Sequence, residues 1–283
     1  MFHMVSLEPV DYLVIGHITV DLTSAGPVIG GTAAYAALTA TAMGLRVGIV
    51  TVRGSEIPLT GLNGIPVIAG ESEASTTFEN IYTASGRIQY IRSRASKIDF
   101  ATVPDVWRRA KIIHLAPMDQ EMDAVLPTDF RPSLVGLTPQ GWFRTWDDKG
   151  RVGLSSWDGM DSALTQAGAV VFSIEDVMHD ENLIEHMAHL CQVMVVTEGE
   201  AGARLFWHGD SRRFRPPVVK EVDPTGAGDV FATAFFVRLL NTRDPWEATR
   251  FANCMAAISV KNFGLAGVPT EEDARKCLME ILD

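Results

Sequence analysis

The sequence is short of cysteine, of positive charge and of long apolar runs, and each shortage excludes a class of protein. Three cysteines among 283 residues favour free thiols in a reducing compartment over a disulfide framework. The first apolar run, residues 12–18, is too short for a signal or membrane segment. With 24 Lys and Arg against 35 Asp and Glu, the net charge is −11 and there is no basic run. We therefore expect a cytoplasmic protein that binds neither nucleic acid nor a membrane.

Two nucleotide-binding motifs are also missing. The chain contains neither GxxxxGK[ST] nor GxGxxG, so P-loop and dinucleotide-binding functions are not expected. The composition, 47% apolar and 21% charged, is that of an ordinary globular protein with a large core.

Short apolar runs separated by helix-length segments dominate the chain. An apolar run at 12–16, an Ala-rich helix at 32–43 and a second run at 47–52 predict a βαβ unit. Further runs of this kind stand at 112–115, 134–137, 169–172 and 193–196. We predict an α/β fold: one doubly wound, mostly parallel central sheet flanked by helices, with residues 1–283 forming a single domain.

Residues 76–100 depart from that pattern. Polar and apolar residues alternate there on both sides of a turn at Ser85-Gly86, which predicts an antiparallel ribbon. The ribbon is either an extra edge hairpin or a lid over a site. A monomer and a homodimer paired through the ribbon are both consistent with it.

The segment from Glu221 to Phe231 carries the clearest chemistry. Gly226-Ala227-Gly228 forms a tight turn before a helix, and such a turn presents unpaired N–H groups and a positive helix end to an anion. Asp229 follows immediately, and a carboxylate beside a phosphate site is suited to accept a proton from an alcohol. Together they indicate phosphoryl transfer. The alternative is an ordinary helix start with Asp229 as a first-turn acid.

DPTGAGD at 223–229 resembles the C-terminal signature of the ribokinase-like (PfkB) sugar kinases, and the resemblance extends along nearly the whole chain. Gly30-Gly31 before the Ala-rich helix is similar to the N-terminal signature of that family. The segment 197–202 resembles the turn that lies beside ATP.

The resemblance implies a role for each matching residue. Asp229 is expected to be the general base, and the amides of Gly226, Ala227 and Gly228 to form the anion hole. The expected acceptor-binding residues are Asp21, Gly31, Thr32 and Tyr35. The expected ATP-binding residues are Thr197, Gly199, Gly202, Thr225, Asn253 and Gly264. Residues 17–30 and 75–100 are expected to form a small β-stranded lid that excludes water.

Two departures from the family pattern bear on the metal and the acceptor. The N-x-x-E motif that organises Mg²⁺ reads Ser173-Ile-Glu-Asp176 here, so we expect Asp176 and Glu175 to serve the metal. Tyr35 stands where many members carry Asn, which indicates an acceptor other than ribose.

The segment 138–144 leaves two interpretations open. It follows an apolar strand, so Gln140 and Arg144 are candidates for contact with substrate or phosphate at the ligand crevice. The alternative is a loop held by a packed Trp142-Phe143 pair.

These observations predict a kinase that uses ATP and Mg²⁺ to phosphorylate a hydroxyl of a small sugar or polyol, with myo-inositol as the favoured type. A nucleoside acceptor is the alternative within the enzyme class. A sugar- or nucleotide-binding sensor that has lost activity is the alternative outside it, supported by the altered metal motif.

Overall fold

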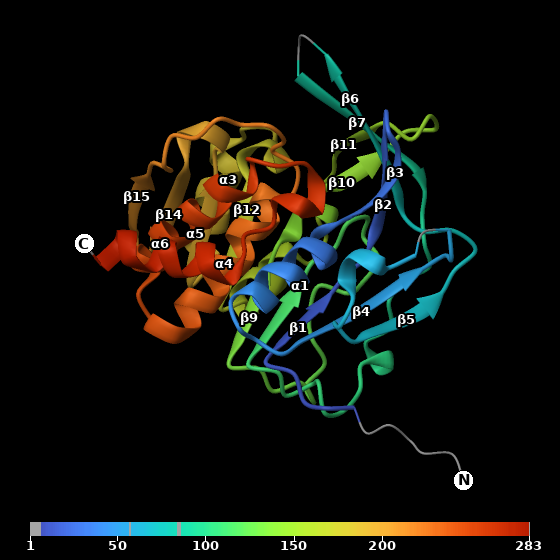
Figure 1. The fold of residues 1–283 in the computed structure, drawn as a ribbon, viewed down its shortest axis with the longest axis horizontal. Coiled ribbons are helices and arrows are strands. Elements are labelled where there is room, and N and C mark those ends of the chain that lie inside the picture. The colour runs from blue at the N-terminus through green and yellow to red at the C-terminus, as the bar shows by residue number, and fades with distance from the viewer. Residues whose placement is uncertain (1–6, 57, 84–85, 283) are drawn as a thin grey trace.

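The computed structural model describes residues 7–56, 58–83 and 86–282 (Figure 1). Within this part of the chain the main sheet has nine strands. They are β1 (Tyr12–Ile15), β4 (Val47–Arg53), β5 (Val67–Glu71), β8 (Ile112–Leu115), β9 (Leu134–Leu137), β12 (Ala169–Ser173), β13 (Val193–Thr197), β14 (Ala203–Trp207) and β15 (Asp210–Phe214). Their order is β15-β14-β13-β12-β9-β8-β1-β4-β5. All neighbouring strands from β5 to β13 pair in parallel. Strands β14 and β15 extend the sheet beyond β13 with two antiparallel pairs. Every predicted apolar run is a strand of this sheet.

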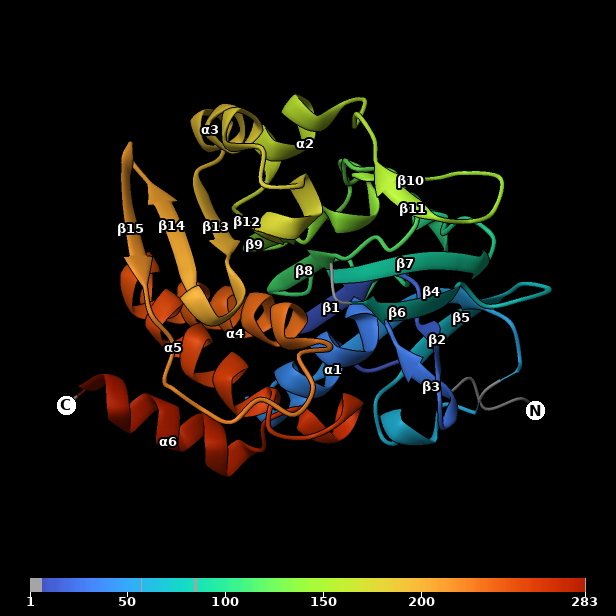
Figure 2. The same cartoon turned by 90° about the horizontal axis from the view of Figure 1, so that it is seen from above.

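Helices cover both faces of the main sheet (Figure 2). One face carries α1 (Thr32–Ala42), α4 (Ala227–Thr242), α5 (Pro245–Ser259) and α6 (Glu271–Leu282), and the other carries α2 (Met160–Gln166) and α3 (Glu181–Leu190). Successive residues of a strand point to opposite faces, so each run is apolar throughout because it is buried on both sides. In β1, Tyr12 and Val14 join the core under α1 and α4, while Leu13 and Ile15 join the other. The doubly wound fold predicted from the sequence is confirmed.

A second, small sheet stands over one end of the main sheet, at the upper right in Figure 1. It contains β2 (Thr19–Thr23), β3 (Gly26–Gly30), β6 (Thr77–Thr83) and β7 (Gly86–Ser93) in the order β3-β2-β6-β7. Strands β2 and β6 pair in parallel and the other pairs are antiparallel. Of the predicted turn at Ser85-Gly86, Ser85 lies outside the described residues. The function of this sheet as a lid stays a prediction.

A short hairpin, β10 (Arg144–Trp146) and β11 (Val152–Leu154), lies beside β7. The amide of Ile91 donates to the carbonyl of Gly150 at 2.8 Å and joins the hairpin to the small sheet.

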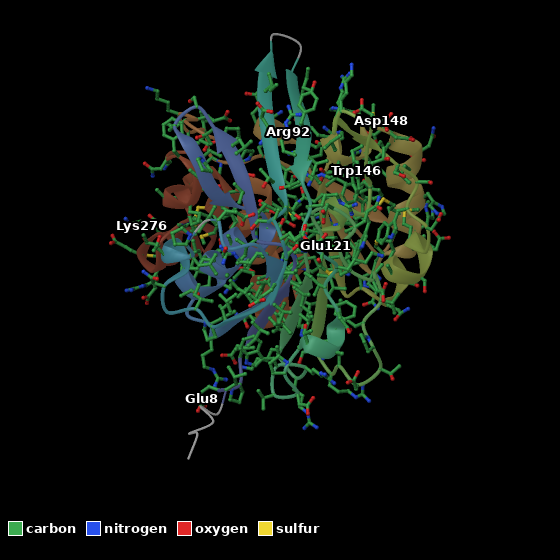
Figure 3. All side chains as sticks on the ribbon, turned by 90° about the vertical axis from the view of Figure 1, so that its right-hand side faces the viewer. Glu8, Arg92, Glu121, Trp146, Asp148 and Lys276 are labelled. Atoms are coloured by element: carbon green, nitrogen blue, oxygen red, sulfur yellow. A yellow bond between two sulfur atoms is a disulfide. The ribbon has the colours of Figure 1, made fainter. Side chains whose placement is uncertain are left out.

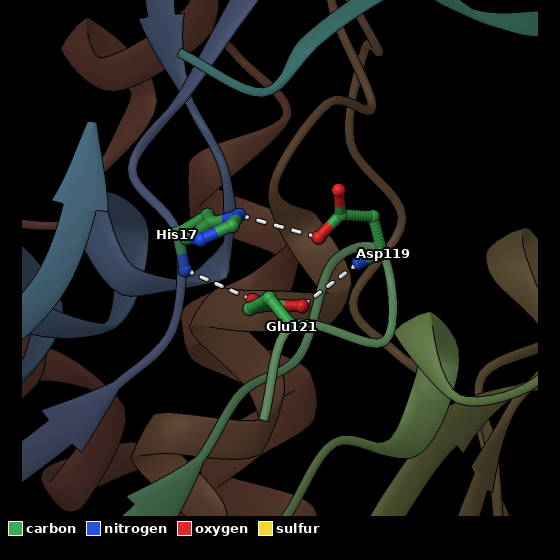
Figure 4. A group of neighbouring side chains, drawn as sticks. All are labelled: His17, Asp119 and Glu121. Atoms are coloured by element: carbon green, nitrogen blue, oxygen red, sulfur yellow. Dashed lines mark hydrogen bonds and ion pairs between the residues drawn. The ribbon is translucent and has the colours of Figure 1, made fainter. Parts of the chain in front are cut away.

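The chain segments that connect the two sheets meet at His17, between β1 and β2 (Figure 4). Its Nδ1 lies 2.8 Å from the hydroxyl of Thr76, just before β6, and its Nε2 donates to the carbonyl of Ser96, after β7, at 3.0 Å. Nδ1 is also 3.2 Å from Asp119 Oδ1, and the amide of His17 donates to Glu121. We call His17, Asp119 and Glu121 the hinge cluster; Glu121 lies near the centre of the molecule (Figure 3).

One expectation about the cysteines is wrong. Cys254 on α5 and Cys277 on α6 form a disulfide, with Cα atoms 5.7 Å apart, and Cys191 is free. Helices α5 and α6 pack together, which brings thiols 23 positions apart in the sequence into contact. The cytoplasmic location that we inferred together with free thiols stays a prediction. No helix among the described residues has the length and apolarity needed to cross a membrane.

Candidate active site

A cleft of about 1040 Å³ lies between the small sheet and the carboxyl ends of the central strands. Its floor includes Thr138, Ser173 and Thr197, at or just after the ends of β9, β12 and β13. Ligand sites of open α/β sheets lie at this edge. All predicted site residues except Thr32 and Gly264 line this cleft.

Asp229 is in the first turn of α4, at the wall of the cleft. The pKa of its carboxyl is raised from 3.8 to about 6, and burial is the largest cause. The negative charges of Asp176 and Asp21 also contribute to this rise, whereas a hydrogen bond from Thr32 and the positive charge of Arg144 oppose it. A carboxylate with this pKa is ionised at neutral pH and is basic enough to assist removal of a proton from a hydroxyl.

Gly226, the N-cap of α4, has no room for a side chain. Its φ is 79°, and a Cβ there would lie 2.1 Å from the ring of Tyr35. Tyr35 is buried in α1, so its ring fixes the turn that starts α4 against the helix that starts at Thr32. The glycine of the signature is therefore required by backbone conformation and by close packing.

The turn before α4 supplies amides to the cleft. Gly226, Ala227 and Gly228 all line it, and the first-turn amides of a helix have no partner inside that helix. Here the amide of Ala227 donates to the carbonyl of Pro224 at 3.2 Å. The positive end of α4 at this point suits an anion.

The cleft wall contains five of the residues expected to contact the acceptor: Asp21, Gly31, Tyr35, Gln140 and Arg144. Asp21 lies on β2 of the small sheet, with its carboxylate over Gly30, where a Cβ would collide with it. Gly31 has a φ of 85° as the N-cap of α1.

Thr32, also expected to contact the acceptor, does not line the cleft. It is fully buried and donates a 2.7 Å hydrogen bond to Asp229 Oδ1.

Both interpretations of residues 138–144 have structural support. Trp142 and Phe143 are buried in the core, while Gln140 and Arg144 reach the cleft.

Two amides of the small sheet line the same cleft, and sequence reasoning missed them. Asn80 on β6 and Gln89 on β7 are cross-strand partners, and Gln89 Nε2 donates to Asn80 Oδ1 at 3.0 Å. Phe78, two residues before Asn80, shares their face. The alternation in 76–100 was the available signal, but it does not say which face meets a ligand.

The cleft also contains five of the residues expected to bind ATP: Thr197, Gly199, Gly202, Thr225 and Asn253. The side-chain amide of Asn253 donates to the carbonyl of Phe214 at 3.0 Å. Small apolar residues also line the cleft: Val218, Val219, Ala256, Ala257 and Val260. This surface suits a flat, weakly polar ring.

Gly264 supports the signature loop from outside the cleft. Its amide donates to Asp223 Oδ2 at 2.9 Å, and the amide of Thr225 donates to Asp223 Oδ1 at 3.0 Å. The roles that we predict for the individual site residues stay predictions.

The altered metal motif brings hard oxygen donors to the cleft. Ser173, Glu175 and Asp176 all line it, and Asp176 acts electrostatically on Asp229. The Ser173 hydroxyl and the Asp176 carboxylate also form a capping box for the turn at 174–177. Two adjacent carboxylates in a cleft suited to phosphate have the donor chemistry that Mg²⁺ requires.

The hinge cluster has a composition that can hold a metal, with candidate ligand atoms within 4.8 Å of one another. Glu121, however, already accepts the backbone amides of His17, Met118 and Asp119 at 2.8–3.0 Å. His17 Nε2 is directed to a carbonyl. Since internal donors occupy these atoms, we assign no metal to the hinge cluster.

Comparison with known proteins gives a consistent picture. Residues 168–272 match the model of the pfkB family carbohydrate kinase. The chain is 40% identical to the inositol 3-kinase of Arabidopsis thaliana over 81 residues, 29% of this chain and 23% of that protein, so this match spans under a quarter of that relative. It is 26% identical to the cytidine kinase of Thermococcus kodakarensis over 282 residues, covering 90% of this chain and 97% of that protein.

Solved structures share the fold. A pyrophosphate-dependent kinase of the ribokinase family, complexed with a pyrophosphate analog and myo-inositol, has a TM-score of 0.78 at 19% identity, covering 93% of this chain and 99% of its own. Arabidopsis thaliana ribokinase complexed with ribose and ATP has a TM-score of 0.72 at 16% identity, covering 96% and 99%.

Proposed function

We propose that the chain is a ribokinase-like kinase of the pfkB family, whose model matches residues 168–272, and that it transfers a phosphoryl group from ATP to a hydroxyl of a small sugar or polyol. The observation that carries this proposal is Asp229, a half-buried carboxylate in the cleft wall whose pKa is raised to about 6, next to the amides that start α4. Charge that develops on the transferred group is stabilised by such amides, while the carboxylate takes the proton of the attacking hydroxyl.

The charges of the cleft support a role for Mg²⁺. Asp21, Glu175, Asp176 and Asp229 all line it. Arginines line it too, at 144, 213 and 215, but a cation held by the carboxylates would reduce their repulsion of a phosphate donor. We propose that Glu175 and Asp176 hold the ion, in part through water. When bound, Mg²⁺ would neutralise charge on the donor phosphates.

Two sides of the cleft support the choice of acceptor and donor. On the acceptor side, Asp21, Asn80 and Gln89 present a carboxylate and amides suited to several hydroxyl groups, as a cyclic polyol offers. The relative acting on inositol and the structural neighbour bound to myo-inositol agree with this choice. On the donor side, the apolar wall beside Asn253 suits a nucleotide base.

A nucleoside is the second candidate acceptor, because the relative matched over nearly its full length is a cytidine kinase. We further propose that the small sheet closes over the acceptor and keeps water away from the donor. Pairing of two copies through this sheet stays a prediction.

The test is release of ADP or phosphate over a panel of pentoses, hexoses, inositols and nucleosides, with ATP or pyrophosphate as donor. Assays with and without Mg²⁺ define the metal requirement. We expect turnover of one acceptor class with ATP, and a loss of ~10² or more in Asp229→Asn. Turnover with pyrophosphate alone would contradict the proposed donor. Binding of ATP or a sugar, seen as a raised melting temperature without turnover, would instead indicate a sensor.

A further inference from the structure

A partly buried chain of hydrogen bonds connects Arg144 to the carboxylate of Asp229. Arg144 Nη2 donates to Gln140 Oε1 at 3.0 Å, Gln140 Nε2 donates to Thr32 Oγ1 at 2.7 Å, and Thr32 Oγ1 donates to Asp229 Oδ1 at 2.7 Å. The four residues come from four separate segments: β10, the turn after β9, the first residue of α1 and the first turn of α4.

The chemistry of the groups sets the direction of every bond. A guanidinium has no acceptor, so the oxygen of the Gln140 amide must face Arg144 and its nitrogen must face Thr32. The Thr32 hydroxyl therefore accepts from Gln140, and its single proton is left for Asp229. One oxygen of the carboxylate is thereby fixed as an acceptor of this bond.

Arg144 is itself held firmly at the far end. Its Nη1 donates to the carbonyl of Met118 at 2.9 Å, its guanidinium lies over the ring of Phe78 at 5.1 Å, and its carbonyl accepts from Gln120 at 2.6 Å. The residue is 8% exposed and Thr32 is fully buried. A rigid charged group thus orients a neutral amide and a hydroxyl toward Asp229.

We propose that Arg144, Gln140 and Thr32 are positioning residues for Asp229: they orient its carboxylate so that Oδ2 receives the proton of the acceptor, and Gln140 and Arg144 contribute through this chain and not through contact with the acceptor. The proposal rests on the proposed function, in which Asp229 is the base. The single donor at Oδ1 and the positive charge of Arg144 also lower the pKa of Asp229, against the larger effect of burial.

The decisive experiment is the pH dependence of kcat/KM for Thr32→Val. Loss of a hydrogen bond to a charged group is expected to move the acidic limb upward by about one pH unit, and thereby to lower kcat near pH 6 by about fivefold. KM for the acceptor should change by less than about threefold, since Thr32 does not line the cleft. Thr32→Ser keeps the hydroxyl and should restore the wild-type limb.

Thr39→Val is the matched control. Thr39 is also buried in α1 and donates a 2.8 Å hydrogen bond, but to the carbonyl of Tyr35 in its own helix. The same substitution there should leave the acidic limb in place.

Gln140→Leu and Arg144→Met extend the test along the chain. Both substitutions should shift the acidic limb of kcat/KM to higher pH, and the shift should be smaller than in Thr32→Val. A rise in acceptor KM of tenfold or more with an unmoved limb would show that these side chains contact the acceptor, and would overturn the proposal.

A measurement that needs no turnover separates this proposal from the proposed function. The ¹³C resonance of the Asp229 carboxyl, assigned by its absence in Asp229→Asn, reports its pKa directly. We expect a higher pKa in Gln140→Leu than in the wild type, and an unchanged pKa would contradict the chain. If no acceptor turns over, the proposed function fails while this titration still decides whether the chain acts on Asp229.

Discussion

Asp119 is a fully buried carboxylate and Asp229 is a half-buried one in the cleft wall, and their surroundings push their pKa values in opposite directions. Burial alone would raise the pKa of Asp119, but its hydrogen bond with His17 and the charges of His17 and Arg94 lower it. Arg94 donates to it at 3.0 Å, and Thr76 reaches it at 3.3 Å. At Asp229 burial prevails, because the structure gives it one neutral donor, Thr32, and a more distant positive charge.

The comparison shows that the number and charge of the hydrogen-bond donors decide whether the pKa of a carboxylate shielded from water rises or falls. Surrounded by cations, Asp119 stays ionised and holds the segments that lead into the small sheet. With a single hydroxyl donor, Asp229 retains an affinity for a proton that a base requires.

Breaking the hinge cluster should change the stability of the protein more than any other substitution discussed below. His17→Leu removes a buried positive charge, and we expect the free energy of unfolding in urea to fall by about 3–5 kcal/mol. Burial would lower the pKa of His17, but the hydrogen bond with Asp119 and the charge of Glu121 raise it above 6.5. The stabilisation is therefore complete below pH 6.5 and is lost as the pH rises through the raised value, so the difference from wild type should shrink there.

His186→Leu is the control for this variant. His186 lies 3.2 Å from Asp161, the same separation as His17 from Asp119, but both partners are more than half exposed. No measurable change in stability is expected there. A loss in His17→Leu no larger than that in His186→Leu would contradict our account of the hinge cluster.

Removing the charge of Asp229 should have the opposite effect on stability. Its pKa, raised from 3.8 to about 6, makes the ionised form cost about 3 kcal/mol at pH 8. Asp229→Asn should therefore unfold at a higher temperature than the wild type at pH 8, although it loses activity. The gain should shrink as the pH falls through 6 and vanish only below about 4, where the carboxyl is protonated in the unfolded state as well.

Asp210→Asn, an exposed position on β15, is the control for that change. If Asp229→Asn is no more stable than Asp210→Asn at pH 8, burial does not make the ionised form of Asp229 costly.

The smallest effect should come from removing the negative charge of Asp176, which acts on the pKa of Asp229. Its charge raises the pKa of Asp229, so Asp176→Asn should move the acidic limb of kcat/KM downward by a fraction of a pH unit. Glu200→Gln removes a charge from the same cleft and should leave the limb in place. A limb that moves equally in both variants would mean that the effect is one of overall charge. Asp176→Asn should also require more Mg²⁺, which a titration of activity against the ion measures.

The sequence predicts well whatever depends on neighbours along the chain. The strands follow from apolar runs, since burial on both faces leaves no alternation, and the turn at Gly226 follows from its glycines. Contacts between distant segments were not predictable. Thr32 and Asp229 are 197 positions apart, and only the fold brings the hydroxyl to the carboxylate.

The same limit applies to Asn80 and to the cysteines. Alternation in 76–100 predicts a ribbon, but the face that meets the cleft depends on how the ribbon stands on the main sheet. The pairing of Cys254 with Cys277 depends on how α5 packs against α6.

The disulfide closes residues 254–277 into a covalent ring, and the Gly264 turn that binds Asp223 lies within it. A ring of this size removes unfolded conformations worth about 3 kcal/mol in a loop-entropy model. The ring also begins one residue after Asn253, on the donor side of the cleft. Because both cysteines are buried, the ring acts as an internal brace behind the segment that supports the signature loop.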